Sequence, residues 1–229
     1  MRGLLIFALL ALALASGQSS PVQDTPVRLT PPLEQRVLHF ELSDAILRDG
    51  IAELSSKSIE GLHLGVEEVL REDINDGPRT RSPHFSLRLE NKTLREILDA
   101  LCDADSRYMW SSDGVSINVY PKAVLGNRSY LLNYELERIT AIDIPNPDQG
   151  LTPLAKLLPN EQIGYAGVGN DPEYAKPWTV TFEHLTVRQY INRIAEHLGP
   201  RSSWIWQGSR KERMFTFLED GFQSAPTIE

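Results

Sequence analysis

The chain has 229 residues, of which 41% are hydrophobic and 24% are charged, and its formal net charge at pH 7 is −8. These values are typical of a globular protein with one large or two small domains, and they exclude disorder over the whole length. The acidic balance, without a basic stripe, argues against binding to nucleic acid and against attachment to anionic lipid.

The N-terminus has the pattern of a secretory signal peptide, predicted at residues 1–17. Arg2 precedes an apolar run from Leu4 to Ala15, which is too short to span a bilayer comfortably and ends in small residues. Cleavage after Ala15 or after Gly17 fits the small-x-small rule, and an uncleaved anchor is the alternative. No cysteine occurs here, which excludes a lipoprotein anchor. We expect a periplasmic or secreted protein with no transmembrane segment after signal cleavage.

Residues 18–36 are rich in Pro, Ser and Thr and predict a flexible lead. Order is expected from Val37. The pattern then predicts a strand with Leu38, Phe40 and Leu42, a helix with Ile46, Leu47, Ile51 and Leu54 that is capped by Ser43 or Asp44, and a second strand with Leu62, Leu64 and Val66. A polar loop is expected at residues 71–83.

A longer pattern follows in FSLRLENKTLREILDAL, from Phe85 to Leu101. Alternating apolar residues predict a half-buried strand, and Thr93 with Glu96 predicts a capping box for the next helix. Apolar residues at helical spacing (Leu94, Ile97, Leu98 and Leu101) predict the buried face of that helix. A hairpin is expected to follow, with Tyr108-Met109-Trp110 in its first strand and Ile117 and Val119 in its second.

The same pattern recurs in WTVTFEHLTVRQYINRI, from Trp178 to Ile194. Thr186 and Gln189 repeat the capping box, and Trp204-Ile205-Trp206 is expected where Tyr108-Met109-Trp110 stood. The elements before it repeat more weakly: a strand at Ile139–Ile144, a short helix with Leu151, Leu154, Leu157 and Leu158, a strand that begins at Ile163, and a loop from Gly164 to Pro177. The period of about ninety residues suits duplication of a small domain.

We therefore predict an α+β protein with two tandem domains, each with two helices packed against small mixed β-sheets. The predicted boundaries are 37–122 for the first domain, 123–133 for a linker, 134–219 for the second domain and 220–229 for a C-terminal tail.

The pattern in FSLRLENKTLREILDALCDADSRYMWSSDGVSINVY, preceded by LHFELSDAILRDGIAEL, resembles the secretin and TonB N-terminus short domain. A similar layout occurs in the C-terminal domain of anti-sigma regulators of the iron-transport type. The resemblance covers residues 37–122 well and 134–218 loosely, and it rests on pattern rather than on a catalytic signature. It implies a protein-interaction module of the bacterial envelope. Because no barrel strands and no regulator-type anchor follow, we expect a free-standing tandem module.

No residues with a catalytic, cofactor-binding or metal-binding pattern are found. The five histidines have no metal-ligand spacing, no nucleophile elbow occurs, and Cys102 lies near the apolar face of a predicted helix. The histidines are expected to be exposed or locally bonded. The glycine-rich segment Gly164–Gly169 lacks the phosphate-loop ending and is expected to be a turn.

We expect a non-enzymatic exported protein-interaction module, with a link to secretin or TonB-type systems as the resemblance implies. The expected partner is an envelope protein, and edge-strand pairing is one way to bind it, because the outer strand of each hairpin can be open. The candidate partner-binding residues are Trp110, Trp204, Trp206, Arg210, Lys211 and Arg213. The alternative is a module that binds a small ligand or a glycan in an aromatic cleft between the domains.

Overall fold

The computed structural model describes residues 32–57, 59, 61–68, 82–114, 116–144, 147–158, 163–168, 177–199, 202–208 and 213–218. The predicted signal peptide, most of the lead and the predicted C-terminal tail lie outside these residues. The first half contains β1 (Arg36–Ala45), α1 (Leu47–Ser56), β2 (His63–Glu67), β3 (Phe85–Thr93), α2 (Leu94–Ala104), β4 (Tyr108–Ser112) and β5 (Ser116–Pro121). The second half contains β6 (Glu135–Ile144), α3 (Pro147–Leu157), β7 (Ile163–Val168), β8 (Trp178–Thr186), α4 (Val187–His197), β9 (Ser203–Gly208) and β10 (Arg213–Leu218).

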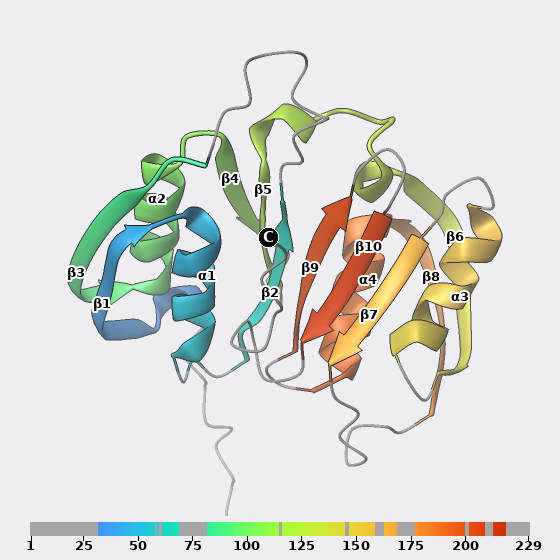
Figure 1. The fold of residues 1–229 in the computed structure, drawn as a ribbon. Coiled ribbons are helices and arrows are strands. Elements are labelled where there is room, and N and C mark those ends of the chain that lie inside the picture. The colour runs from blue at the N-terminus through green and yellow to red at the C-terminus, as the bar shows by residue number, and fades with distance from the viewer. Residues whose placement is uncertain are drawn as a thin grey trace, which may run out of the picture.

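The two halves have the same order of elements (Figure 1): strand, helix, strand, strand, helix and two-stranded hairpin. This order was predicted from the sequence, and the structure confirms it. The fold class is α+β, with four α-helices among the described residues and with antiparallel and mixed sheets. None of the helices in the described part of the chain is long and apolar enough to cross a membrane. Short 3-10 helices also occur: η1 (Pro32–Glu34), η2 (Lys122–Val124) and η3 (Leu131–Asn133).

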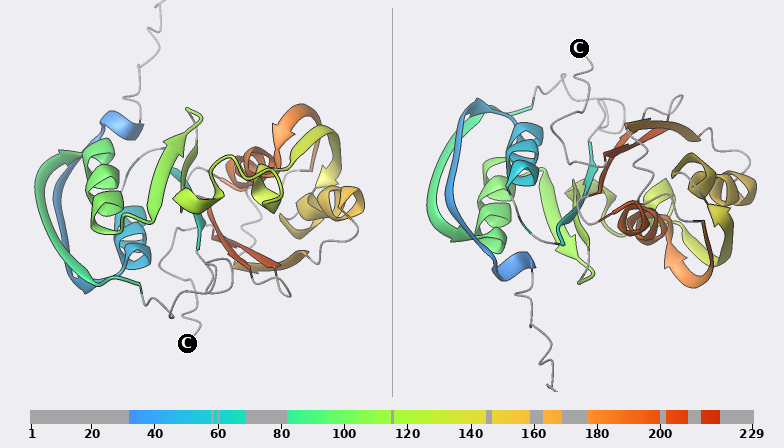
Figure 2. Two further views of the ribbon diagram at one scale, coloured as in Figure 1. Left: turned by 90° about the horizontal axis from the view of Figure 1, so that it is seen from above. Right: turned by 90° about the horizontal axis from the view of Figure 1, so that it is seen from below.

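Each half contains a two-stranded antiparallel ribbon, β1 with β3 and β6 with β8. The register shifts at the same place in both ribbons, after Leu42 in β1 and after Ala141 in β6. Asn91 in β3 and His184 in β8 also match, with φ values of 50° and 54°. Such irregularities bend and twist a strand, and Figure 2 shows each ribbon curving around its two helices. The ribbons, helices and central sheet therefore form successive layers.

Both predicted capping boxes are present. The Thr93 hydroxyl accepts from the Glu96 amide at 3.3 Å, and the Glu96 carboxylate accepts from the Thr93 amide at 2.8 Å. In the second half, Thr186 and Gln189 make the same two hydrogen bonds at 3.3 and 2.8 Å. The predicted helix faces are also buried: Leu94, Ile97, Leu98 and Leu101 in α2, and Val187, Tyr190, Ile191 and Ile194 in α4. The local sequence therefore determines where α2 and α4 begin and which face each buries.

A six-stranded sheet contains strands from both halves, in the order β4-β5-β2-β9-β10-β7. β2 and β9 are parallel neighbours at its centre, and they join the first half to the second. We predicted small sheets confined to each domain, whereas the structure has one sheet shared by both halves. Each half contributes three strands to this sheet: the two strands of its hairpin and one further strand that runs parallel to its hairpin neighbour. This further strand is β2 beside β5 in the first half and β7 beside β10 in the second.

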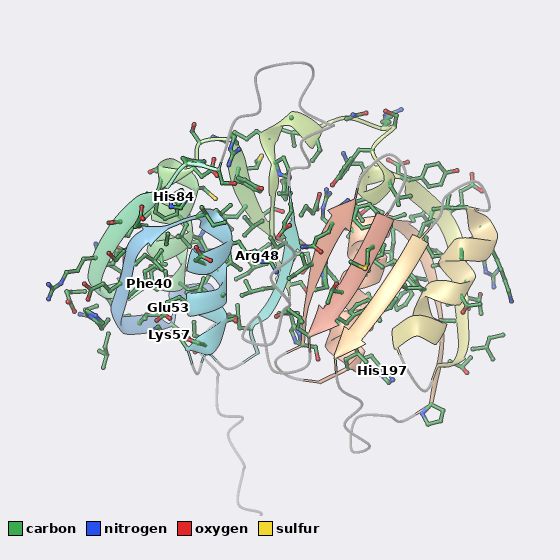
Figure 3. The ribbon with its side chains drawn as sticks, in the orientation of Figure 1. Phe40, Arg48, Glu53, Lys57, His84 and His197 are labelled. Atoms are coloured by element: carbon green, nitrogen blue, oxygen red, sulfur yellow. The ribbon has the colours of Figure 1, made fainter. Side chains whose placement is uncertain are left out.

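Two clusters of buried hydrophobic side chains lie between the layers, one in each half. Phe40 is fully buried in the first cluster and lies beside α1 in Figure 3. The first cluster also includes Ile205 and Leu218, which belong to strands of the second half. The second cluster includes Leu131 and Leu132, which lie in the predicted linker. The protein thus has two hydrophobic cores that meet at the shared sheet, where strands of the second half contribute side chains to both.

A glycine recurs at the fourth position of the first helix in each half, Gly50 in α1 and Gly150 in α3. A Cβ on Gly50 would lie 2.4 Å from Leu101 Cδ2 in α2, and a Cβ on Gly150 would lie 3.1 Å from Ile194 Cδ1 in α4. Leu101 and Ile194 are themselves equivalent. Glycine therefore allows the two helices of each half to approach closely, although it lowers helix propensity.

Several local predictions differ from the structure. Ser43 and Asp44, the predicted caps of α1, lie in β1; the N-cap is Ile46, whose amide donates to the Asp49 carboxylate at 2.9 Å. Leu38 was placed on the buried face of the first strand, but it is 77% exposed because Val37 and Phe40 take the inward positions.

Two strands of the central sheet also differ from expectation. The alternating pattern predicted that β2 is half-exposed. All five of its residues are buried instead, because β2 lies inside the sheet between β5 and β9. Gly164 was expected to begin a loop but lies in β7, which continues to Val168. The predicted loop at residues 71–83 lies almost wholly outside the described residues.

Candidate functional site

The structure describes the side chains of three of the six candidate partner-binding residues, the tryptophans. Trp204 and Trp206 are 1% and 4% exposed, and both rings pack against Phe215 in the second cluster, with centroid separations of 6.2 and 4.4 Å. This burial corrects the expectation for these two tryptophans, whose rings stabilise the core and do not reach the surface. Trp110 is only partly buried. Arg210 and Lys211 lie outside the described residues, as does the side chain of Arg213.

Trp110 and Trp204 are equivalent residues of the two halves. The indole Nε1 of Trp110 donates to Asp99 Oδ1 at 2.8 Å, and that of Trp204 donates to Asn192 Oδ1 at 2.8 Å. Both acceptors lie six residues after the N-cap of their helix. The prediction matched Trp110 with Trp206 instead, two residues away, because it aligned Tyr108-Met109-Trp110 with the similar triplet Trp204-Ile205-Trp206.

At the junction of the halves, Gly65 of β2 lies opposite Trp204 of β9. A Cβ on Gly65 would lie 2.3 Å from Trp204 Cζ2 and 2.6 Å from Asn118 Oδ1. Contacts this short would force the tryptophan ring to move. Glycine at this position therefore lets the ring of one half lie against the strand of the other.

Two residues further along β2, Glu67 forms an ion pair with Arg188 of α4. The Glu67 side chain is fully buried and that of Arg188 is 14% exposed. Arg188 Nε and Nη2 donate to the two carboxylate oxygens of Glu67, the Nη2 bond at 3.0 Å, while Nη1 donates to Asn133 Oδ1 at 2.8 Å. The guanidinium also lies 4.7 Å from the ring centroid of Tyr120 in β5. This arrangement links β2, β5 and α4.

Burial raises the pKa of the Glu67 carboxyl above its ordinary value, while the hydrogen bond and charge of Arg188 act in the opposite direction. The bidentate geometry uses both carboxylate oxygens, which is what a buried carboxylate needs to remain charged. Removing Arg188 would leave this carboxylate buried without its countercharge.

Arg95 of α2 is the equivalent of Arg188, since each is the second residue of its helix. Its side chain is 48% exposed, and its Nε and Nη2 donate to Glu34 Oε1 at 3.3 and 3.0 Å. Glu34 ends η1, as Asn133 ends η3. The Arg95 guanidinium carbon lies 5.8 Å from the ring centroid of Trp110. The first half therefore presents at its surface the pair of side chains that the second half buries at the junction.

These side chains lie beside one end of the sheet. Among the described residues, β4 pairs with β5 alone and β7 pairs with β10 alone, so each has one edge without a strand partner there. The strand β9, which is the equivalent of β4, pairs with β2 along its corresponding edge. The ribbon and helices of a half therefore do not obstruct this edge. The outer edge of β4 with Arg95 and Trp110 is hereafter called the β4 edge.

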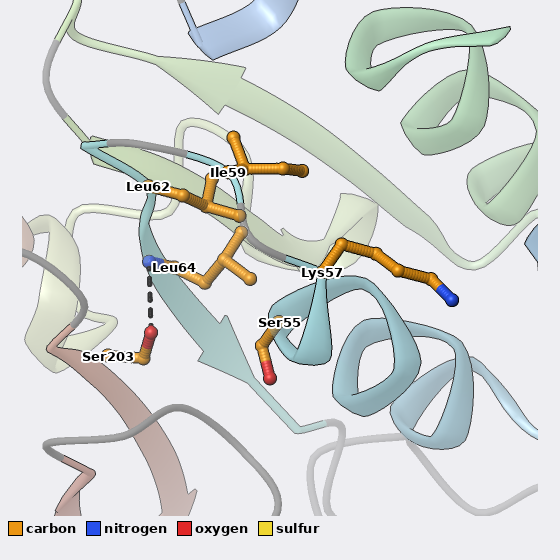
Figure 4. Close-up of a pocket in the computed structure, with 6 residues that line it drawn as sticks. All are labelled: Ser55, Lys57, Ile59, Leu62, Leu64 and Ser203. Carbon is orange, nitrogen blue, oxygen red and sulfur yellow. Dashed lines mark hydrogen bonds between the residues drawn. The ribbon is translucent and has the colours of Figure 1, made fainter. Parts of the chain in front are cut away.

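A small pocket also lies close to the junction (Figure 4). Its empty volume is about 210 Å³, including space open to solvent, and its lining residues are Ser55, Lys57, Ile59, Leu62, Leu64 and Ser203. Pockets for small molecules are typically about 300–1,000 Å³. None of the lining residues is aromatic, so this pocket is not the aromatic cleft expected between the domains.

The described residues contain no group of three or more His, Cys, Asp or Glu that could hold a metal ion. Cys102 is buried, as predicted, and burial raises the pKa of its thiol to about 12, so the thiol is protonated at neutral pH. His63 was expected to be exposed or locally bonded, but it is buried and its Nδ1 lies 3.1 Å from the Ser202 carbonyl oxygen across the junction.

The sequence contains signals for three residues that were not among the predicted site residues. An arginine follows the first residue of both capped helices, at Arg95 and Arg188, and Glu67 interrupts an otherwise apolar strand pattern. A charge within a buried strand requires a partner. The recurring arginine supplies a candidate for that partner, and the structure identifies it as Arg188.

Comparison with known proteins found no match, whether with protein families, with curated proteins or with solved structures.

Proposed function

We propose that this chain is a non-enzymatic protein-binding module of the bacterial cell envelope, which binds an envelope protein by strand pairing at an edge of its sheet. The observation that carries the proposal is the junction between the halves. There the fold already binds a strand, β2, along β9, and the equivalent edge of β4 has no strand partner among the described residues.

Strand addition suits such an edge. A strand at the end of a sheet presents unpaired backbone N–H and C=O groups, which can pair with an extended segment of another protein. Backbone hydrogen bonds then provide affinity, and side chains next to the edge provide specificity. At the β4 edge these side chains are Arg95 and Trp110.

The proposal also includes the origin and location of the module. The two halves are tandem copies of one α+β unit that resembles the secretin and TonB N-terminus short domain. The matching capping boxes, ribbon bulges and helix glycines support this relation. The signal-like residues 1–17 support export to the periplasm or beyond, and a link to secretin or TonB-type systems follows from the resemblance.

Capture followed by hydrogen exchange tests the proposal. The mature, tagged protein captures partners from a detergent-solubilised envelope of its source organism, and amide exchange is then compared between the free protein and the purified complex. We expect slower exchange in β4 or β7, with little change in β9, whose two edges are already paired. A stoichiometric partner that leaves β4 and β7 unprotected, or the absence of any partner, would contradict strand pairing.

A further inference from the structure

We propose that the β4 edge binds a parallel strand of another protein, and that this strand has a glycine opposite Trp110 and an acidic residue two positions later that pairs with Arg95. This inference rests on the proposed function, and it specifies the chemistry of the partner. The template is the strand that the protein already binds to itself, β2, with its sequence Gly65-Val66-Glu67.

The internal template shows what each residue of the bound strand does. Gly65 makes room for the ring of Trp204, since a Cβ there would lie 2.3 Å from the indole. Glu67 receives two hydrogen bonds from the guanidinium of Arg188. Backbone pairing also continues past the end of the strand, where the Glu68 amide donates to the Trp206 carbonyl oxygen at 3.0 Å. Small size and negative charge, two residues apart, are therefore the features that β9 and α4 recognise.

The β4 edge retains the receiving side of this interaction. Trp110 has the same hydrogen bond from its indole as Trp204, and Arg95 has the same position in its helix as Arg188. The Arg95 guanidinium lies over the Trp110 ring at 5.8 Å, whereas that of Arg188 lies over the Tyr120 ring at 4.7 Å. The carboxylate partner differs as well: the fork of Arg95 donates to Glu34 of its own chain, whose side chain is 51% exposed. An incoming carboxylate would take the place of Glu34.

The chain's own free strand does not fit this site. The strand pairing shows which residue of β7 is equivalent to Val66. In the first half, Val119 pairs with Trp110 on one side and with Val66 on the other. In the second half, Phe217 pairs in the same way with Trp204 and with Gly167, so Gly167 is the equivalent of Val66. Ala166 and Val168 therefore stand where β2 has Gly65 and Glu67. A second copy that offered β7 would bring a Cβ to the tryptophan and no charge to Arg95. The partner strand of the proposal is therefore taken to belong to a different protein.

Binding of a peptide with the sequence of residues 61–68, GLHLGVEE, tests the inference on the full chain. Affinity is measured by fluorescence anisotropy of the labelled peptide, and hydrogen exchange locates the binding site. We expect binding that protects the amides of β4. The variant Arg95→Glu should weaken binding at least tenfold, which corresponds to about 1.4 kcal/mol. A peptide with Glu67→Lys should also lose at least tenfold on the wild-type protein and recover on Arg95→Glu.

Three further comparisons make the test specific. Arg88→Glu changes the same charge on β3, where the side chain is 71% exposed, and should leave the affinity unchanged. Glu34→Gln removes the competing carboxylate and should strengthen binding. A peptide with Gly65→Val should bind at least tenfold more weakly, because its side chain would meet Trp110. Thermal unfolding of each protein variant confirms that the fold is retained.

The outcomes distinguish the inference from the proposed function. No peptide binding at millimolar concentration, binding that Arg95→Glu leaves unchanged, or concentration-dependent self-association that the peptide does not inhibit would each overturn the inference. If a captured partner protects β4 while Arg95→Glu does not affect its affinity, strand pairing stands and only the predicted acidic strand is wrong. If captured partners protect neither β4 nor β7, the proposed function itself is wrong.

Discussion

The two halves have the same local structure but place equivalent side chains in different surroundings. Arg188 is 14% exposed and pairs with a fully buried carboxylate, whereas Arg95 is 48% exposed and pairs with a carboxylate at the surface. Trp204 is 1% exposed, whereas its equivalent Trp110 is only partly buried. The helix, the cap and the hairpin are alike in both halves. The difference arises because a strand lies against β9 and none of the described strands lies against the outer edge of β4.

This comparison shows that burial at these positions depends on the place of the unit in the sheet rather than on the unit itself. The same arginine and tryptophan belong to the interior in one half and to the surface in the other. An interior-type pair of side chains that remains at the surface is therefore a reason to look for a missing neighbour, and the following variants test how different the two environments are.

The largest difference is expected for the two arginines. Arg188→Ala would leave the Glu67 carboxylate buried without its countercharge, which typically costs about 3–5 kcal/mol in the free energy of unfolding. Arg95→Ala removes an exposed ion pair and should cost about 0–1 kcal/mol. Urea unfolding of both variants measures the two losses. Equal losses would show that the environments of the two arginines are energetically alike.

The two helix cores should respond equally. Leu98 and Ile191 are both fully buried and lie at the same distance from their capping threonines. Leu98→Ala and Ile191→Ala should each lower the free energy of unfolding by about 2–5 kcal/mol. Denaturant unfolding tests this, with the exposed Leu38→Ala as a control that should cost little. Losses near zero at both buried positions would contradict the equivalence of α2 and α4.

The helix glycines should respond unequally. Gly50→Ala would place its Cβ 2.4 Å from Leu101 Cδ2 and 3.1 Å from Leu42 Cδ1, so overpacking should cost about 1–3 kcal/mol. Gly150→Ala faces the end of the Ile194 side chain at 3.1 Å, and a gain in helix propensity of about 1 kcal/mol can offset that contact. Thermal unfolding should show Gly50→Ala to be clearly the less stable variant. The reverse order would mean that the second pair of helices is packed more tightly than the first.

The smallest effect concerns pH and the two capping boxes. The pKa of Glu96 is lowered to about 2 from its ordinary 4.5, first by the hydrogen bond from Lys92 and then by that from the Thr93 amide. Because the folded pKa is lower than the unfolded one, this stabilisation is complete above pH 4.5 and is lost as the pH falls towards about 2. Unfolding midpoints measured between pH 5 and pH 2 should therefore fall less steeply for Glu96→Gln than for the wild type.

The second capping box provides the matched control, because Gln189 does not titrate. Gln189→Glu should add a pH-dependent contribution that is weaker than that of Glu96, since Leu185 stands where the first half has Lys92. Parallel pH profiles for Glu96→Gln and the wild type would show that the capping box does not depend on the charge of Glu96.

Features that depend on residues close together in the sequence could be predicted, whereas features that depend on distant residues could not. The capping boxes at Thr93 and Thr186 involve residues three positions apart, so the pattern was sufficient to find them. The cap of α1 was missed because Asp49 accepts from the amide of an apolar N-cap residue, Ile46, which has no capping side chain. The local sequence could not reveal the neighbour of Gly65, because its partner lies 139 residues later in the chain.

The candidate site was affected in the same way. The prediction selected tryptophans by composition, and the structure buried two of them because a strand from the other half covers β9. An alternating apolar strand looks the same whether it ends a sheet or lies inside one, since its own residues do not show which strands flank it. Trp110 was among the predicted residues, but Arg95 became a candidate only when Arg188 showed what an arginine at that position binds.

The parallel contact of β2 with β9 has a consequence for assembly. It joins two different surfaces of the repeated unit, so the relation between the halves is a heterologous one, with the second unit displaced along the sheet. A two-fold contact would use the same surface on both units and would be complete with two. A heterologous contact instead leaves one donor edge and one acceptor edge at opposite ends, unless the rotation between successive units closes a ring. Among the described strands these two ends are β4 and β7, and the proposed partner strand would extend the sheet at β4.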